Sequence, residues 1–260
     1  MPELPDVAGF KKYLDATSLH QKIRTTRCHD DRFVKGLSRQ SLQRRLKGTK
    51  LTGSRQWGKW LFVAMDAKGY LVLHFGMTGG LDYGAGDPPE HARLVLHFDN
   101  DKRLAILSQR MIGRASWTDD LKAFGEQHEL GPDALDIDAD RFVEMFRSKR
   151  GAVKSALMDQ SLIAGIGNVY SDEICFQTRM HPGSKVPKLG ESRLRDLQKA
   201  MRRVLSVASR KGGNGHKAPR SWLLGGRGED SPCPRCGGNL DSTTINGRTS
   251  WFCPACQPAP

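Results

Sequence analysis

The spacing of hydrophobic residues changes from a helical to a strand period near the start of the chain. Val7, Phe10 and Leu14 stand at helical spacing, which predicts a short amphipathic helix over residues 5–16. Residues 21–117 then carry short segments rich in β-branched and aromatic residues, separated by turn signals. The predicted strands are 22–27, 50–56, 60–65, 70–75, 93–98 and 103–107. This pattern predicts an antiparallel β-sandwich or barrel.

One helix is expected to interrupt these strands. Ser38 is a suitable N-cap, the helix continues to Leu46, and Gly48 follows its end. We therefore expect an N-terminal β-sandwich domain over residues 1–118, followed by a connecting segment over 119–140.

The later part of the chain has a helical pattern. Helices are predicted over 140–149, 153–158, 169–177 and 190–210. The last is strongly amphipathic, with apolar residues at Leu194, Leu197, Met201, Val204, Leu205 and Ala208. Residues 211–230 are rich in glycine and basic residues, which indicates a mobile connector. A chain of 260 residues is also long for one core, so we expect an α+β multidomain protein with a helical domain over 141–230 and a module over 231–260.

The charge of the chain points to a polyanionic partner. The formal net charge is +13, and most of the positive excess falls between Arg141 and Arg227. Such a concentration of charge favours nucleic acid as the partner, although any single basic run can be a solvated surface. No signal peptide or membrane-spanning stretch is evident, so no membrane partner is expected and the protein is predicted to be cytoplasmic.

Four of the six cysteines have metal-ligand spacing. Cys233 and Cys236 form one Cys-x-x-Cys pair, and Cys253 and Cys256 form a second after a predicted hairpin turn at 246–247. Four thiolates close a tetrahedral site with no open position, so one zinc ion is expected to stabilise the fold of this module rather than to catalyse. Two disulfides are the alternative, which the predicted reducing compartment disfavours.

The first residues also suggest chemistry. Removal of Met1 would leave Pro2 as a free secondary amine next to the carboxylate of Glu3. An α-amino group has a pKa near ~8, so part of it is unprotonated at neutral pH and can attack a sugar C1′ to form an iminium. The alternative is structural, because a proline-rich start is also typical of helix entry, with Pro5 in the first turn.

Three separated motifs carry a resemblance to a known family. They are MPELPDV at residues 1–7, DQSLIAGIGNVY at 159–170 and RTSWFCPACQ at 248–257. With these motifs in this order, the chain resembles the formamidopyrimidine-DNA glycosylase and endonuclease VIII family over nearly its whole length. The resemblance implies a β-sandwich behind a catalytic N-terminal helix, a helix-two-turn-helix in the helical domain, a zinc finger, and damaged double-stranded DNA as the partner of a monomer.

The resemblance also implies a reaction. A damaged base is flipped out of the duplex, Pro2 attacks C1′ and displaces the base, and β- and δ-elimination then cleave the strand. Glu3 is expected to protonate the sugar during ring opening. Because an unperturbed glutamate has a pKa near ~4.3, a raised pKa is expected for Glu3. The implied activity is that of a bifunctional glycosylase and abasic-site lyase for oxidised or ring-opened purines.

Other site residues follow from the same resemblance. Lys59 matches a catalytic lysine near the lesion phosphate, while Asn168 and Arg248 match residues that hold the DNA backbone. Asn168 can also be a plain N-cap of its helix. Lys154 is a further expected DNA contact.

The residues expected to fill the space left by the flipped base differ in part from the family pattern. Met77 matches the residue that fills this space, and Arg110 matches the arginine that faces the orphaned base. Ile112 stands where the family has a phenylalanine wedge. The segment 211–231 is also shorter than the loop that covers the everted base in the guanine-lesion branch. The shortened segment makes an endonuclease VIII-like enzyme for oxidised pyrimidines one alternative function. A non-catalytic reader of damaged DNA is another.

Overall fold

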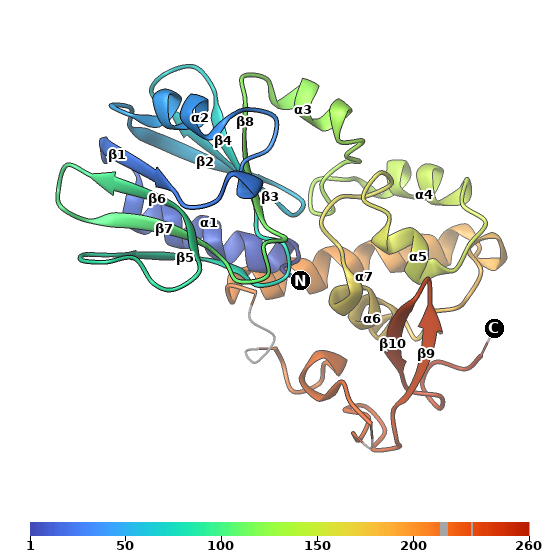
Figure 1. Ribbon diagram of the computed structural model, residues 1–260. Helices are drawn as coiled ribbons and strands as arrows, with labels where there is room; N and C mark the ends of the chain where they lie inside the picture. The colour runs from blue at the N-terminus through green and yellow to red at the C-terminus, as the bar shows by residue number, and fades with distance from the viewer. Residues whose placement is uncertain (214–217, 230, 260) are drawn as a thin grey trace. The chain divides into compact units, whose positions relative to one another are not determined.

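A computed structural model describes residues 1–213, 218–229 and 231–259 (Figure 1). These residues form two compact units. The first contains residues 1–2 and 6–128, and the second contains residues 3–5 and 129–259. The first is built mainly on β-sheets and the second on helices, so the predicted α+β class is confirmed.

The first unit contains two antiparallel sheets of four strands. One has the order β1–β6–β7–β5, formed by Ile23–Cys28, Ala92–Phe98, Arg103–Ser108 and Gly79–Gly84. The other has the order β2–β3–β4–β8, formed by Leu51–Trp57, Trp60–Met65, Tyr70–His74 and Arg114–Thr118. Side chains from both sheets, including Leu61 and Leu96, share one buried core. This is the predicted β-sandwich.

The sequence pattern did not predict strands β5 and β8. Both are edge strands, so each has only one neighbour in its sheet. Strand β5 has the sequence GGLDYG and no buried residue, and Ala115 is the one buried residue of β8. Their strand conformation depends on hydrogen bonds to β7 and β4 rather than on hydrophobic alternation.

Two α-helices and a 3₁₀ helix precede or interrupt the first strands of the sandwich. Helix α1 (Leu4–Ser18) places Val7 and Leu14 in the sandwich core. Helix α2 (Arg39–Leu46) begins after the predicted N-cap Ser38, whose hydroxyl accepts a hydrogen bond from Ser41 N–H. A 3₁₀ helix, η1, spans Asp31–Phe33.

Helix α3 (Leu121–Gln127) was not predicted, and it belongs to the first unit, beyond residue 118. Its Phe124 ring packs edge-on against Phe62 of β3, with ring centroids 5.2 Å apart. The helix therefore covers the outer face of a sheet whose inner face forms the sandwich core. This double coverage explains why nearly every residue of β3 is buried.

Among the residues that the structure describes, the second unit has four α-helices and two 3₁₀ helices. Helices α4, α5, α6 and α7 span Ala139–Arg147, Val153–Met158, Asn168–Gln177 and Glu191–Arg210. The 3₁₀ helices η2 and η4 span Val186–Lys188 and Leu223–Gly226. All six apolar positions predicted for the buried face of α7 are buried. The expected mobile connector falls partly outside the described residues, at 214–217 and 230.

The turns between α5 and α6 are held by one side chain. Gln160 Nε2 donates to the carbonyl oxygens of Met158 and Ile166, and Gln160 Oε1 accepts from Gly165 N–H. Gly165 has a φ of +120°, a conformation that glycine adopts without strain. These contacts form the expected helix-two-turn-helix.

The chain ends in a β-hairpin. Strands β9 (Asp241–Ile245) and β10 (Arg248–Phe252) pair antiparallel around a two-residue turn. Asn246 and Gly247 both have positive φ, at +50° and +69°, as a type I′ turn requires. The predicted hairpin is confirmed. Within the residues that the structure describes, no helix has the length and apolar character to cross a membrane.

Candidate functional site

The carboxylate of Glu3 lies at the N-terminus of helix α6. Glu3 is 2% exposed. Its Oε2 accepts hydrogen bonds from Gly167 N–H (2.6 Å) and Tyr170 N–H (3.2 Å), and its Oε1 accepts one from Val169 N–H (2.8 Å). Gly167, the N-cap of α6, offers no side-chain acceptor, so Glu3 caps this helix from the other end of the sequence.

The hydrogen bonds of Glu3 favour its ionised form, which a proton donor must leave. Three backbone donors and the positive end of a helix dipole all stabilise the ionised carboxylate of Glu3. Burial of the carboxylate acts in the other direction, so the raised pKa expected for Glu3 stays a prediction.

The approach of Glu3 to the helix requires a glycine at position 167. A Cβ atom on Gly167 would lie 2.5 Å from Glu3 Cδ and 2.6 Å from Glu3 Oε1, well inside contact distance. Pro2, which precedes Glu3 in the chain, is half-buried, and Met1 is exposed.

Lys59 lies in the turn between β2 and β3 and is 9% exposed, so it is far less solvent-accessible than an isolated surface lysine. A neighbouring group that the sequence analysis missed is His74 at the end of β4. Burial, together with the charges of Arg114 and Lys59, lowers the pKa of His74 to about 4, so the imidazole is neutral at pH 7. Arg114 lies over the ring of Trp60, 4.5 Å from its centroid, and Trp60 pairs with His74 across the sheet. Lys59 and Arg114 therefore give a positive charge to this end of the β2–β3–β4–β8 sheet.

Met77, Arg110 and Ile112 lie on two adjoining loops of the first unit. The side chains of Met77 and Ile112 are 43% and 47% exposed, which is unusual for large apolar residues. Arg110 Nη1 lies 3.6 Å from the sulfur of Met77, and Arg110 N–H donates to Thr78 Oγ1. The structure therefore brings together the three residues expected to enter the DNA stack.

Asn168 is the first residue of α6 and not its N-cap, so that alternative is wrong. Its Nδ2 donates to the carbonyl oxygen of Thr249 in β10 at 3.2 Å. The amide nitrogen carries a second N–H, which can donate to a phosphate. The Asn168 side chain is thus oriented by the zinc-finger hairpin.

Lys154 is not placed to contact DNA. Its side chain is fully buried, and its Nζ forms an ion pair of 2.6 Å with Asp172 of α6. Burial lowers the pKa of Lys154, an effect that the Asp172 carboxylate opposes. The expectation of a direct DNA contact treated Lys154 as a surface cation, whereas the side chain of this α5 residue points into the core.

Arg248 follows the hairpin turn and is exposed, as expected for a phosphate ligand. It contributes to a surface cavity of about 500 Å³ in the second unit. Lys149 and Arg150 line the same cavity. Asp159 lines this cavity too and pairs with Lys149 Nζ at 2.9 Å, so the positive excess of the space comes from Arg150 and Arg248.

The four cysteines of the terminal module fit one zinc ion. Their sulfur atoms all lie within 4.8 Å of one another. Cys236 Sγ and Cys253 Sγ are 3.6 Å apart, and Cys233 Sγ and Cys256 Sγ are 4.0 Å apart. A zinc–sulfur bond of ~2.3 Å in tetrahedral geometry gives a sulfur–sulfur separation near ~3.8 Å. A disulfide needs ~2.05 Å, so these separations match a structural zinc site and not the alternative of two disulfides.

Comparison with known proteins decides the family. The chain is 31% identical to the formamidopyrimidine-DNA glycosylase of Acaryochloris marina over 99% of both chains. It is also 31% identical to that of Mycolicibacterium smegmatis, over 100% of this chain and 98% of the relative. The chain belongs to the formamidopyrimidine-DNA glycosylase family.

Family models and solved structures agree with this membership. The formamidopyrimidine-DNA glycosylase N-terminal domain matches residues 1–115, the H2TH domain of the same family matches 130–219, and the zinc finger found in FPG and IleRS matches 230–259. Fpg of Lactococcus lactis, solved with DNA containing N7-benzyl-Fapy-dG, has a TM-score of 0.90 and 27% identity over 99% of this chain and 100% of its own. The same enzyme solved with DNA containing an abasic site has a TM-score of 0.89.

Proposed function

We propose that this protein is a bifunctional DNA glycosylase and abasic-site lyase of base excision repair, acting on oxidised or ring-opened purines. The observation that carries the proposal is the buried Glu3 carboxylate, fixed by three backbone N–H groups next to Pro2 in a member of this family. A protein that only binds DNA needs neither Pro2 nor Glu3.

The chemistry begins at Pro2 once Met1 has been removed. An ionised Glu3 accepts a proton from the Pro2 ammonium, which frees the nitrogen lone pair for attack on C1′. The bond between C1′ and the base breaks, and the base leaves with the electron pair and takes up the remaining proton of the Pro2 nitrogen. Glu3 then delivers its proton to the ring oxygen as the sugar opens, which leaves an iminium between Pro2 and C1′. Loss of the C2′ proton with the 3′ phosphate, and then of the C4′ proton with the 5′ phosphate, completes β,δ-elimination.

The other residues hold the DNA in this proposal. Lys59 contacts the phosphate of the lesion, while Asn168 and Arg248 hold the backbone beside it. Met77, Arg110 and Ile112 enter the space that the flipped nucleotide leaves, consistent with two exposed apolar side chains on neighbouring loops.

Borohydride trapping tests the reaction class. Wild-type protein incubated with abasic DNA and borohydride should form a covalent complex, because reduction fixes the iminium. Pro2→Gly should reduce the yield strongly, since it replaces the secondary amine. An equal yield from Pro2→Gly would exclude Pro2 as the main nucleophile.

A panel of duplexes tests the substrate. The proposal expects 8-oxoguanine and formamidopyrimidine to be excised faster than thymine glycol. Preference for thymine glycol would support the oxidised-pyrimidine alternative, and tight binding without cleavage of any lesion would support a non-catalytic reader.

We further propose that the enzyme acts in the cytoplasm, because its proposed substrate is DNA, and that it acts as a monomer, because one chain carries the proposed catalytic and zinc residues. Sedimentation of the protein with a short abasic duplex should give a complex of one chain per duplex.

A further inference from the structure

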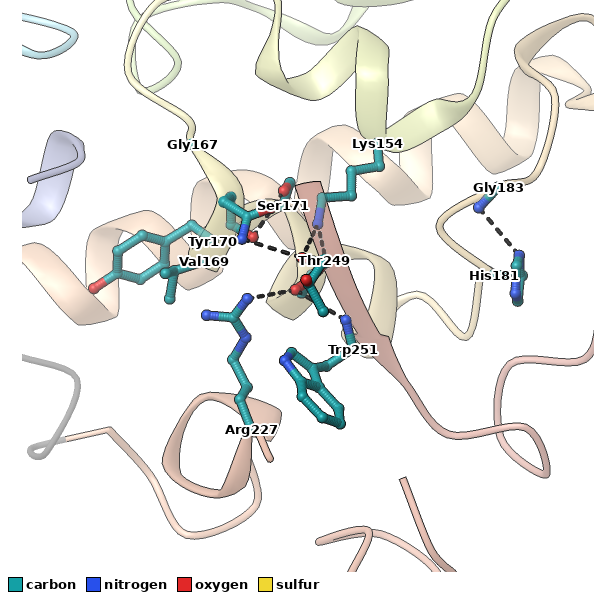
Figure 2. A network of polar contacts seen from close by, with 12 residues as sticks. Lys154, Gly167, Val169, Tyr170, Ser171, His181, Gly183, Arg227, Thr249 and Trp251 are labelled. Carbon is teal, nitrogen blue, oxygen red and sulfur yellow. Dashed lines mark hydrogen bonds and ion pairs between the residues drawn. The ribbon is translucent and has the colours of Figure 1, made fainter. Parts of the chain in front are cut away.

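A single buried carboxylate joins three segments of the second unit. Asp172 lies in α6 and is fully buried. Its Oδ1 pairs with Lys154 Nζ of α5 at 2.6 Å, and its Oδ2 pairs with Arg227 Nη2 at 2.7 Å. The same Oδ2 accepts the backbone N–H of Trp251 in β10 at 3.2 Å. Figure 2 shows Lys154, Arg227 and Trp251 converging on one point beside Thr249.

These contacts fall on the outer edge of strand β10. Opposed residues of an antiparallel pair alternate between exchanging hydrogen bonds and pointing their backbone groups away from the partner strand. Counted from the two-residue turn, Thr249 and Trp251 are the residues whose backbone groups face away from β9. Side chains of α5 and α6 therefore pair with the backbone edge that the hairpin leaves open.

The carbonyl oxygen of Thr249 is shared by two donors. Lys154 Nζ lies 3.4 Å from it, and Asn168 Nδ2 lies 3.2 Å from it. Arg248 is the residue before Thr249. The two expected phosphate ligands of this unit, Asn168 and Arg248, are thus connected through one carbonyl group whose place depends on the Asp172 cluster.

The connector before the zinc finger is held by the same helix. Arg227 directly follows η4, and Leu224 of η4 donates its N–H to Oε2 of Glu173 at 2.9 Å. Two consecutive acidic residues of α6 therefore fix this part of the connector. Burying the charges of Lys154 and Asp172, with the Arg227 side chain 16% exposed beside them, is costly, and apolar residues of similar size often stabilise a fold as well or better. The cluster is therefore better explained by the positions that it gives to the neighbouring segments than by a gain in stability.

We propose that Asp172, Lys154 and Arg227 form a positioning cluster that sets the placement of Arg248 relative to Asn168 for binding the phosphates beside the lesion. The proposal rests on the proposed function, and it assigns no contact with DNA to the cluster itself. Arg227 acts through Asp172 on the backbone of β10, and Lys154 acts both through Asp172 and on Thr249.

A double-mutant cycle between Arg227 and Arg248 tests this role. Arg227→Met leaves a balanced Lys154–Asp172 pair, and Arg248→Ala removes the expected phosphate contact. The measured quantity is the dissociation constant for a duplex with a stable abasic-site analogue. We expect Arg248→Ala to weaken binding by about tenfold or more and Arg227→Met by about fivefold. The double variant should bind about as weakly as Arg248→Ala alone, because the effect of Arg227 passes through Arg248.

Arg220→Met is the matched control. It makes the same exchange at an exposed arginine of the same connector, so it corrects for the loss of one positive charge. It should change the dissociation constant by less than about twofold. If Arg227→Met does not fold, Lys154→Met gives the second cycle, since it leaves a balanced Arg227–Asp172 pair.

Two results would overturn the proposal. One is a double variant whose loss equals the product of the two single losses, which would show that Arg227 acts independently of Arg248. The other is unchanged binding in Arg227→Met. Failure of the proposed function would be seen separately, as wild-type protein that neither binds the abasic duplex nor forms a trapped complex.

Discussion

Glu3 Oε2 accepts a 2.6 Å hydrogen bond from the backbone N–H of Gly167, across 164 positions of sequence. The contact ties the residue next to the proposed nucleophile to the start of helix α6. It also explains why residues 3–5 belong to the second unit while residues from 6 to 128 belong to the first.

Gly167→Ala should impair catalysis by moving this carboxylate. The added Cβ would lie 2.5 Å from Glu3 Cδ, so Glu3 or the helix start must shift. A displacement of about 1 Å of a catalytic group can cost roughly 100-fold, and strand cleavage of abasic DNA should fall by that order. Single-turnover cleavage assays measure it. Gly190→Ala, where a Cβ meets nothing within 4 Å, should cleave like the wild type.

Glu173 should make the stability depend on pH near neutrality. Burial raises the pKa of Glu173 to about 7, well above the usual range of a glutamate. An acid with a raised pKa stabilises the fold fully below its unfolded pKa, and that stability is lost as the pH rises through the folded pKa. Between pH 6 and pH 8 the free energy of unfolding should therefore fall by about 1 kcal/mol from this group.

Glu173→Gln should remove this contribution, because an amide does not titrate and its oxygen can still accept the Leu224 N–H. Urea unfolding of both proteins at pH 6 and pH 8 measures the difference. An equal pH dependence in the variant would contradict the assignment to Glu173.

Removal of zinc should weaken DNA binding through loss of the hairpin. Apart from its cysteines, this small module contributes few buried apolar residues such as Leu240 to a core, and zinc modules of this kind unfold without metal. Treatment with a chelator should release one zinc ion per chain, and the affinity for abasic DNA should fall at least tenfold as Arg248 loses its support. Cys28→Ser, which changes a thiol outside the quartet, should keep both zinc and binding.

Met77→Ala and Ile112→Ala should separate function from stability. Both side chains are more than 40% exposed, so the free energy of unfolding should change by less than about 0.5 kcal/mol. Excision of a lesion base should slow by about tenfold in each variant, because an inserted apolar side chain stabilises the everted state. Equal excision rates in the variants and the wild type would show that these side chains stay outside the duplex.

The sequence was most informative where a local pattern determines the structure. The apolar face of α7, the Ser38 cap and the cysteine spacing each depend on residues close in sequence, and each was predicted correctly. Edge strands β5 and β8 were not predicted, because the neighbouring strand determines their conformation.

The environment of a side chain was harder to predict than the helix or strand that carries it. Lys154 was expected to contact DNA, yet it is buried with a carboxylate partner 18 positions away in the sequence. One signal was available, since Asp172 and Glu173 interrupt an otherwise apolar helix pattern between Tyr170 and Phe176. Two adjacent acids on a buried helix indicate partners elsewhere, which here are Lys154, Arg227 and the connector.

The cap that Glu3 provides to α6 makes the second unit a discontinuous domain. A fragment that begins at residue 129 would lack the acceptor for the N–H groups of Gly167, Val169 and Tyr170. The second helix of its helix-two-turn-helix, α6, would therefore lack its cap. The helical part of this protein should be less stable when expressed alone, and a short peptide carrying the first residues should restore part of that stability when added in trans.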